Sequence, residues 1–251
     1  MDIIEAIEKR ISCRAFDLQR PVELEKVEAI EGEIARIREE SGLNFQLCGP
    51  REDGTAVDLS RGMFACNPPY CAAFAAPEGP IPEERLGYFG ERLVLFVEQL
   101  GLSTCWVAGT FDRETARVEL AEGEKLHDVI PIGYAPEKMP LKQRTIRKGI
   151  RSRDKKPEAL WQGSTPLMYA PEWIRACIDG VIKGPSAINE QPVVFVQDGQ
   201  GMPVSAKLSN IKSGLEYTDL GIAKYHFEVV ARACGINGTW EWGDGGAFVI
   251  E

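Results

Sequence analysis

The feature that most constrains the fold of this chain is an internal repeat. Residues 86–106, LGYFGERLVLFVEQLGLSTCW, resemble residues 220–240, LGIAKYHFEVVARACGINGTW. Three landmarks match at a constant offset of 134 residues: Gly87 with Gly221, Gly101 with Gly235, and Trp106 with Trp240. Two unrelated amphipathic helices that end in glycine would also look alike. The pattern around them therefore has to distinguish a duplication from a chance similarity. If that pattern repeats as well, the chain contains two similar structural halves.

Apolar spacing predicts the elements of the first half. Over residues 86–100 leucine and phenylalanine recur at spacings of three and four, which predicts a helix that stops at Gly101. Valine and isoleucine over 27–37 predict an earlier helix that ends near Ser41-Gly42, followed by the strand-like NFQLC. A late strand is expected in DVIPIGYA, residues 128–135.

The second half repeats this order. A helix is expected from about Glu172 to Lys183, followed by the strand VVFV, and GAFVIE at 246–251 corresponds to the late strand of the first half. Each half therefore reads helix, strand, strand, helix, strand, which is an α+β order and not strict βαβ alternation.

The expected domain organisation follows from the repeat. We expect a first half over 1–135, a connector rich in lysine, arginine and proline over 136–170, and a second, shorter half over 171–251. Two similar halves are expected to pack about a pseudo-twofold axis, as two subunits do in a symmetric homodimer. A site where the halves meet can take different residues from each.

Composition excludes several classes of function. The 251 residues are 44% hydrophobic and carry a net charge of −9, which argues against nucleic-acid or anionic-membrane binding. No apolar run approaches the roughly 20 residues that span a bilayer. The acidic, amphipathic start MDIIEAIEKR is not expected to be a signal peptide.

The cysteine pattern indicates the compartment. Seven cysteines without a CxxC pair, together with two histidines, do not form a zinc pattern. Most of the cysteines stand in apolar surroundings, so we expect them to be small core residues in a reducing compartment, the cytoplasm.

Three polar residues near the start form a candidate anion site. Arg10, Ser12 and Arg14 alternate with small apolar residues in KRISCRAFD, so an extended backbone would place all three on one side. Two guanidinium groups and a hydroxyl make a good phosphate receptor. The alternative is a solvated surface segment.

The second candidate is the stretch IKGPSAINEQPVVFVQD, residues 182–198. Here Ser186, Asn189 and Gln191 precede a buried strand, and Pro185 and Pro192 are expected to hold the shape of the loop. These polar groups could bind the edge of a flat heterocycle. A capped helix end followed by an ordinary turn explains the composition equally well.

Two further segments are weaker candidates. In GLSTCWVAGTFD, residues 101–112, the small residues Ala108 and Gly109 would let the backbone approach a planar ligand, or simply form a turn before a helix that starts at Asp112. The basic run RSRDKKPEAL, residues 151–160, could add a lysine to a phosphate site or be a solvated connector. The sequence has no Ser-His-Asp arrangement, P-loop or dinucleotide fingerprint, so no catalytic side chain is assigned.

Taken together, these segments resemble the FMN-dependent nitroreductase family. The resemblance rests on AIEKRISCRAFD, GPSAINEQPVVF, GLSTCWVAGTFD, and IPIGYAPEK leading into KKPEAL, and it covers nearly the whole chain. Ordinary members of the family are homodimers with FMN at the interface. Here the arginine motif lies in the first half and the loop in the second, which resembles a tandem-duplicated branch in which one chain is a pseudo-dimer.

The resemblance implies a set of cofactor-binding residues. Arg10, Ser12 and Arg14 would hold the FMN phosphate and ribityl chain, with help from Lys155 or Lys156. The isoalloxazine ring would be lined by Pro185, Ser186, Ala187 and Asn189, while backbone near Ala108 and Gly109 would approach flavin N5. Many members have glycine where this chain has Ala108. The first half has no corresponding loop and the second half has no arginine motif, so one FMN site per chain is expected.

The resemblance also implies an activity. The chain would be an FMN-dependent oxidoreductase that takes electrons from NAD(P)H through flavin N5 and passes them to a small organic acceptor, with no metal and as a monomer. One alternative is a non-catalytic flavin-binding or storage protein whose pocket is closed by the proline-rich stretch 66–82. Another is a duplicated interaction module that has lost its cofactor.

Overall fold

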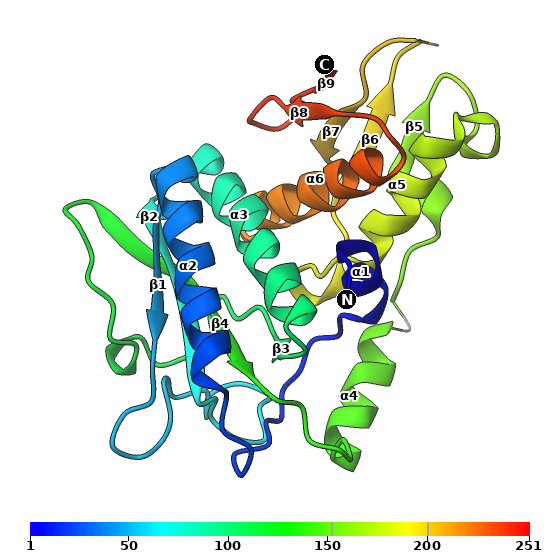
Figure 1. Cartoon of the computed structure of the whole chain (residues 1–251). Coiled ribbons are helices and arrows are strands. Elements are labelled where there is room, and N and C mark those ends of the chain that lie inside the picture. The colour runs from blue at the N-terminus through cyan, green and yellow to red at the C-terminus, as the bar shows by residue number, and fades with distance from the viewer. Residues whose placement is uncertain (152, 200) are drawn as a thin grey trace. The chain divides into compact units, whose positions relative to one another are not determined.

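The computed structural model describes residues 1–151, 153–199 and 201–251. The chain forms two compact units, each assembled from separate stretches of sequence. The first unit comprises Met1–Asp2, Lys9–Glu78 and Arg92–Gly149, and the second comprises Ile3–Glu8, Gly79–Glu91 and Ile150–Glu251. The elements of both units are drawn in Figure 1.

The first unit contains a four-stranded antiparallel sheet. Its strands are β1 (Asn44–Cys48), β2 (Tyr70–Pro77), β3 (Ser103–Thr104) and β4 (Glu124–Gly133), in the order β1-β2-β4-β3. Helix α2 (Leu24–Ser41) lies along one face of this sheet (Figure 1). The helix ends where Gly42 adopts a left-handed conformation, with φ of 66°, and its N–H donates to the carbonyl of Arg38.

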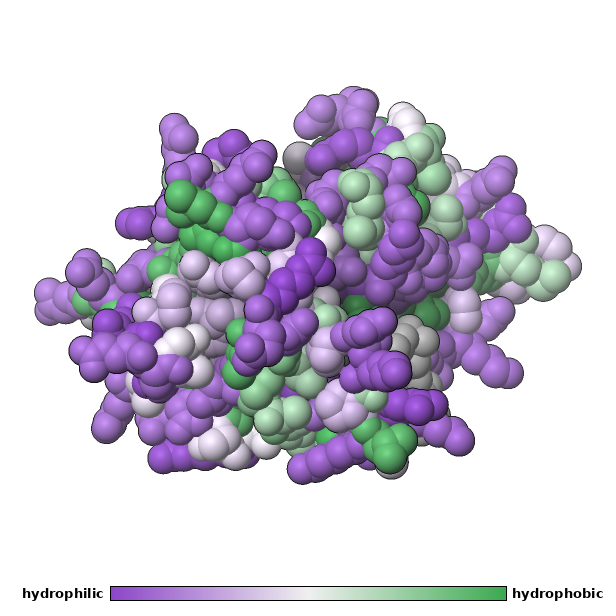
Figure 2. Space-filling model, turned by 60° about the horizontal axis from the view of Figure 1, so that its bottom comes forward, coloured by the Kyte–Doolittle hydropathy of each residue, from purple (hydrophilic) through white to green (hydrophobic). Residues whose placement is uncertain are grey.

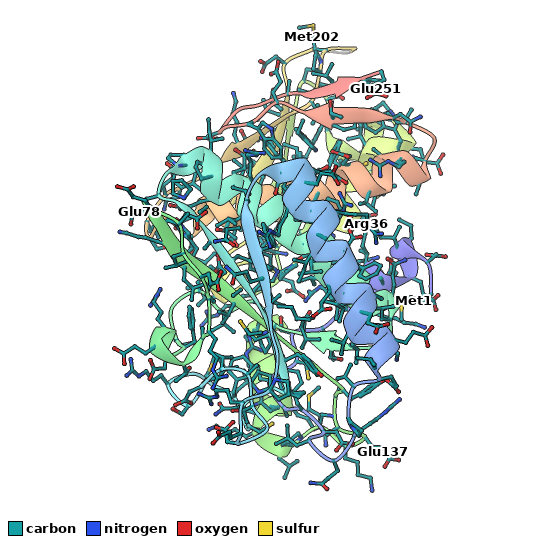
Figure 3. All side chains as sticks on the ribbon, turned by 60° about the vertical axis from the view of Figure 1, so that its left-hand side comes forward. Met1, Arg36, Glu78, Glu137, Met202 and Glu251 are labelled. Carbon is teal, nitrogen blue, oxygen red and sulfur yellow. The ribbon has the colours of Figure 1, made fainter. Side chains whose placement is uncertain are left out.

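The two faces of this sheet are covered differently. On the α2 face, Ile30, Ile34 and Ile37 of the helix are buried, as the apolar spacing predicts. Arg36 lies on the outer side of α2 in Figure 3 and pairs with Glu33 at 2.7 Å. Loops cover the opposite face and form a second apolar cluster that includes Leu59, Phe111 and Val129.

The second unit combines helices with short strands. Helices α5 (Glu172–Lys183) and α6 (Glu216–Ala233) pack against each other, and α1 (Ile3–Lys9) is tied to the end of α5 by an ion pair between Glu8 and Lys183. Its strands are β5 (Trp161–Gly163), β6 (Val193–Gln197), β7 (Ser205–Leu208), β8 (Gly238–Trp240) and β9 (Phe248–Ile250).

The strands of the second unit follow the order of the first. Strands β6 and β7 are antiparallel, β8 and β9 are antiparallel, and a bridge between Ser205 and Ala247 connects β7 to the segment that enters β9. These strands form two sheets, β5-β6-β7 and β8-β9, and through the bridge the succession β6-β7-β9-β8 is similar to β1-β2-β4-β3 of the first unit. A cluster of aromatic rings fills the core, with Phe195 and Phe227 stacked at 5.0 Å and Phe248 at 5.4 Å from Phe227.

Helix α3 (Pro80–Gln99) supplies residues to both units, since its residues up to Glu91 belong to the second and those from Arg92 to the first. Its C-terminal stop matches that of α6. Gly101 and Gly235 both have a positive φ, 76° and 82°. In each case the next amide, of Leu102 or Ile236, donates to a carbonyl five residues back. In both halves the predicted helix, strand, strand, helix is present, but two strands follow the last helix where one was predicted: β3 and β4 in the first half, and β8 and β9 in the second.

Two segments contain elements that the sequence did not indicate. The region 136–170, expected to be a connector, contains α4 (Leu141–Arg151), the 3-10 turns η2 (Pro157–Leu160) and η3 (Leu167–Tyr169), and β5, which pairs parallel with β6. Its lysines and arginines are good helix formers, which a reading based on solvation overlooks. The stretch 66–82 contains β2, which lies between β1 and β4 in the sheet, so it is not a cover for a pocket.

The surface and the cysteines complete this description. Hydrophilic residues dominate the face shown in Figure 2, with small separate hydrophobic patches. None of the helices in the described part of the chain is both long and apolar enough to span a membrane. All seven cysteines are free and five are buried, but Cys234 is exposed, contrary to its expected core position, because α6 ends one residue before it.

Candidate functional site

The arginine segment of the first unit lies outside the regular elements. Residues 10–16 form neither helix nor strand, so the extended backbone that the alternation of polar and apolar residues predicts stays a prediction. The amide of Cys13 donates to the carbonyl of Thr104 in β3 at 2.7 Å, and the carbonyl of Arg14 accepts from the amide of Ala65 at 2.8 Å. The segment is therefore held between β3 and the loop that leads to β2.

The three predicted polar side chains gather around one thiol. Burial raises the pKa of Cys105, whereas the guanidinium groups of Arg14 and Arg10 and the hydroxyl of Ser12 act in the opposite direction. Arg10 is buried, and Ser12 and Arg14 are half-buried. Arg10, Ser12 and Arg14 therefore all act on the thiol of Cys105. Sequence reasoning treated Cys105 only as core filling, since a lone cysteine after a short strand gives no other signal.

An acidic side chain stands near this cluster. The pKa of Glu98, in the last turn of α3, is raised because the side chain is partly buried. The positive charges of Arg10 and Lys9 oppose this shift without cancelling it. One oxygen of Glu98, Oε2, is buried without a hydrogen-bond partner among the described residues. The carboxyl group of Glu98 is therefore in reach of two positive charges, those of Arg10 and Lys9.

The segment after Cys105 offers open space. A Cβ added at Gly109 would meet no atom within 4 Å, so no neighbouring residue fills the volume beside this backbone. Ala108 is half-buried, and its carbonyl accepts from Arg113 at 3.4 Å. The helix start expected at Asp112 is confirmed, because its side chain accepts from the amide of Glu114 at the start of η1 (Arg113–Thr115).

The loop between α5 and β6 in the second unit has an unusual backbone. Ile188, Asn189 and Gln191 all have positive φ, 44°, 60° and 45°. A β-branched residue such as isoleucine rarely adopts this conformation, and its side chain here is 67% exposed. Strained backbone of this kind tends to occur at binding sites, because the surrounding structure has to maintain it.

Side chains of the same unit hold this loop in place. The side-chain amide of Asn189 donates to the carbonyl of Ile150 and to the carboxylate of Asp154. The side-chain amide of Gln191 donates to the carbonyl of Ile182. The hydroxyl of Ser186 accepts from the amide of Gln191 at 2.9 Å. The donors that we expected to bind a heterocycle are thus used within the protein, so a ligand contact from Asn189 rests on its oxygen and stays a prediction.

The two predicted lysines differ in their environment. Lys155 is joined to the loop, because its amide donates to the side chain of Gln191 at 2.7 Å and its ammonium donates to the carbonyl of the same residue at 2.8 Å. Lys156 is exposed and caps η2 through its backbone. Lys155 therefore has a structural role in the second unit, while the ammonium of Lys156 points to solvent.

Asp219 is a residue of this site that sequence reasoning missed. It is buried in the first turn of α6, and both of its carboxylate oxygens accept from the amide of Ala187, at 2.9 and 3.1 Å. A cavity of about 20 Å³ lies beneath the loop and is lined in part by Ser186 and Asp219. Because that volume holds about one water, an organic ligand of this loop has to contact its outer side.

A buried ion pair fixes another segment of the second unit. The ammonium of Lys224 lies 2.5 Å from Glu84 and donates to the carbonyls of Glu241 and Gly243, while the amide of Gly243 donates to Glu84. Burial lowers the pKa of Lys224, and the charge of Glu84 opposes this shift. The pair thereby holds the turn that carries Trp242, which packs on Tyr88 at 5.3 Å.

The predicted site residues therefore fall into two groups. Arg10, Ser12, Arg14, Ala108 and Gly109 belong to the first unit, where the first three are brought together. The second unit contains Lys155, Lys156, Pro185, Ser186, Ala187 and Asn189, with Lys155 joined to the loop. A common site for both groups stays a prediction.

Comparison with solved structures identifies the fold. A protein from Thermotoga maritima described as a "putative nitroreductase" matches with a TM-score of 0.66 and 20% sequence identity, over 100% of this chain and 93% of that chain. A nitroreductase with bound FMN from Bacteroides fragilis and an FMN-dependent nitroreductase from Clostridium difficile match with a TM-score of 0.42 each. Their identities are 19% and 21%; they cover 56% and 54% of this chain, and 92% and 89% of their own chains. The first match shows that the chain has a nitroreductase-type α+β fold.

The sequence itself identifies the family. The profile of the family described as "Putative TM nitroreductase" matches residues 2–231, which is most of the chain, so the protein belongs to this nitroreductase family. No protein with a curated description matches the sequence. The expected nitroreductase membership is thus confirmed.

Proposed function

We propose that this protein is an FMN-dependent oxidoreductase that takes electrons from NAD(P)H and passes them to a small organic acceptor. The observation that carries this proposal is the segment of Arg10, Ser12 and Arg14 in a chain that belongs to a nitroreductase family: its backbone is bonded to Thr104 and Ala65, and its polar side chains act on the Cys105 thiol. The thiol of Cys105 is a weak nucleophile near neutral pH because burial raises its pKa, which suits a protein whose role is to bind and orient a cofactor.

The residues of the first unit fit the phosphate end of FMN. Two guanidinium groups and a hydroxyl would bind the phosphate through charge-assisted hydrogen bonds. The open volume beside Gly109 leaves room for a planar group to approach the backbone. When bound, the flavin supplies hydride acceptance and release at N5. We propose that the loop carrying Ser186 and Asn189 completes the site.

The proposed pseudo-dimer is supported by details of the repeat. The sheet orders of the two units correspond, and the helices α3 and α6 stop with the same pair of hydrogen bonds. Gly87 and Gly221 make reciprocal close contacts, as residues related by a twofold axis do. The proposed boundaries remain 1–135, 136–170 and 171–251.

One flavin per chain is part of this proposal. At the constant offset, Ala108 corresponds to Trp242, whose ring packs on Tyr88 and Phe89. The second half therefore has the large indole ring of Trp242 at the position where the first half has the methyl group of Ala108. We also propose a monomer, because a pseudo-dimer supplies both halves of the site from one chain, and a cytoplasmic location, where seven free thiols stay reduced.

The test is a spectrum followed by reduction. Purified protein, supplied with FMN if necessary, should show flavin absorbance at one equivalent per chain, and anaerobic NADPH or NADH should bleach it. Added nitroaromatic or quinone should then restore the oxidised spectrum. Flavin that stays oxidised under excess donor would favour the storage protein, and failure to take up FMN would favour a module without cofactor. Light scattering of the holoprotein tests the proposed monomer.

A further inference from the structure

Helix α4 has a charge opposite to that of the rest of the chain. Its eleven residues, LKQRTIRKGIR, include five basic and no acidic residues. The other 240 residues contain 24 basic and 38 acidic residues, a net charge of −14. A strongly acidic protein repels an anionic substrate, so a local basic element is where such a substrate can approach.

The described basic side chains of α4 are available to a ligand. Lys142, Arg144 and Lys148 are exposed, and none of the three forms an ion pair or a side-chain hydrogen bond with the described residues. Arg144 and Lys148 are four residues apart and therefore lie one above the other on the same side of the helix. The helix is anchored by Gln143, its buried residue, whose amide nitrogen donates to the carbonyl of Met63 at 2.8 Å.

The anchor of α4 leads to the arginine segment within the first unit. Two residues after Met63, the amide of Ala65 donates to the carbonyl of Arg14, and the thiol of Cys66 accepts from the amide of Phe16 at 3.2 Å. One short stretch of chain, residues 63–66, therefore contacts both α4 and the segment that carries the proposed phosphate-binding arginines. The basic helix and this segment are neighbours in one compact unit.

We propose that α4 binds the phosphates of the dinucleotide electron donor and favours the donor with a 2′-phosphate, NADPH. This inference rests on the proposed oxidoreductase function. The 2′-phosphate adds a charge of about −1.5 to −2 near neutral pH, as other phosphate monoesters do. A guanidinium fork and ammonium groups bind such a group through charge-assisted hydrogen bonds. The helix is only about 16 Å long, which suits a dinucleotide better than a polymer.

The experiment compares two triple variants with the same change in net charge. The first variant reverses the charge of three side chains of α4, by Lys142→Glu, Arg144→Glu and Lys148→Glu. The matched control reverses three exposed basic residues elsewhere that make no ion pair among the described residues, Arg117→Glu, Arg175→Glu and Lys207→Glu. For both, kcat/KM is measured with NADPH and with NADH at low and high ionic strength, and the binding of adenosine 2′,5′-bisphosphate and of adenosine 5′-monophosphate is measured by calorimetry.

The α4 variant should lose at least about tenfold in kcat/KM with NADPH at low ionic strength, with kcat unchanged and a smaller loss with NADH. High ionic strength should reduce the difference, and binding of the 2′,5′-bisphosphate should weaken in parallel. Equal losses in the two triple variants, or unchanged affinity for the bisphosphate, would overturn the proposal. Thermal unfolding checks the fold, and the neutral variant Lys142→Gln/Arg144→Gln/Lys148→Gln replaces the reversal if that unfolds.

Calorimetry separates this proposal from the proposed function. If neither donor reduces the flavin, the oxidoreductase proposal fails, and the affinity for the 2′,5′-bisphosphate still reports on α4. If NADPH and NADH reduce the wild-type protein with the same kcat/KM and the bisphosphate does not bind, the oxidoreductase proposal stands and the role of α4 is rejected.

Discussion

Gly87 and Gly221 make the same contact in opposite directions. A Cβ added at Gly87 would lie 2.0 Å from the carbonyl oxygen of Thr218, and one added at Gly221 would lie 1.8 Å from that of Glu84. Thr218 and Glu84 are themselves 134 residues apart, the offset of the sequence repeat. The two helices can approach this closely because neither residue has a side chain at the contact.

Replacing either glycine by alanine should therefore strongly destabilise the second unit. The added methyl group has to push backbone away, which costs about 1–3 kcal/mol or more of the free energy of unfolding. Urea unfolding of Gly87→Ala and Gly221→Ala measures this loss. Gly32→Ala in α2 is the control, since its Cβ meets nothing within 4 Å, and it should be neutral or stabilising. Equal stability of all three variants would contradict the close contact.

Removal of the two arginines should abolish flavin retention. Each hydrogen bond to a charged group contributes about 1.5–3 kcal/mol, so Arg10→Ala/Arg14→Ala should raise the dissociation constant for FMN by at least about 100-fold. Fluorescence titration of the apoprotein with FMN gives this number. Arg14→Gln alone is the milder variant, because Arg10 is buried and its loss also affects folding. Arg117→Ala/Arg175→Ala should bind FMN like the wild type.

Relief of the strained loop should stabilise the protein and weaken its site. Because Ile188 has a φ of 44° and is exposed, Ile188→Gly should raise the free energy of unfolding by about 1 kcal/mol. The same change at exposed Ile211, which has no positive φ, should lower it. If the loop contacts FMN, Ile188→Gly should also weaken FMN binding, because a flexible loop has to be ordered again. A loss of stability at position 188 would contradict the strain.

Buried thiols should make stability fall at alkaline pH. Burial raises the pKa of Cys13 from its ordinary value of 9.0 to about 11. Between these values the unfolded chain ionises while the folded chain stays protonated, so the free energy of unfolding falls as pH rises through this window. The loss approaches about 1.4 kcal/mol per pH unit for one thiol. Denaturant unfolding from pH 8.5 to about 11 should show a shallower decline for Cys13→Ala. Cys234→Ala removes an exposed thiol and should leave the slope unchanged.

The repeat made much of the fold predictable, because matched glycines and apolar spacing define elements locally. The helix expected from about Glu172 to Lys183 agrees with α5, and NFQLC agrees with β1. Strand β5 was missed because three residues with a single apolar side chain carry no pattern, and its pairing with β6 is set by tertiary contacts. Helix α4 was missed because its charge was taken as a sign of a solvated connector.

The site was predictable only in part. Alternation in KRISCRAFD predicts that Arg10, Ser12 and Arg14 point to one side, since an extended backbone fixes the direction of successive side chains. It could not indicate that all three act on the Cys105 thiol, because the position of the segment beside β3 depends on the hydrogen bond between Cys13 and Thr104. Nor could the sequence indicate that the side-chain amides of Asn189 and Gln191 donate hydrogen bonds to other groups of the protein. The hydrogen bonds from Ala187 to Asp219, which hold the loop, were not predictable either.

The division of α3 between the two units means that no single cut in the chain can separate them. A fragment that starts at residue 171 would leave Lys224 without Glu84 and His226 without Glu91, which lies 2.9 Å from its imidazole. Each of these would become an uncompensated polar group in an apolar core. Neither fragment is therefore expected to fold alone, and the two are expected to reassemble when they are produced together, because α3 of the first fragment supplies Glu84 and Glu91 to α6 of the second.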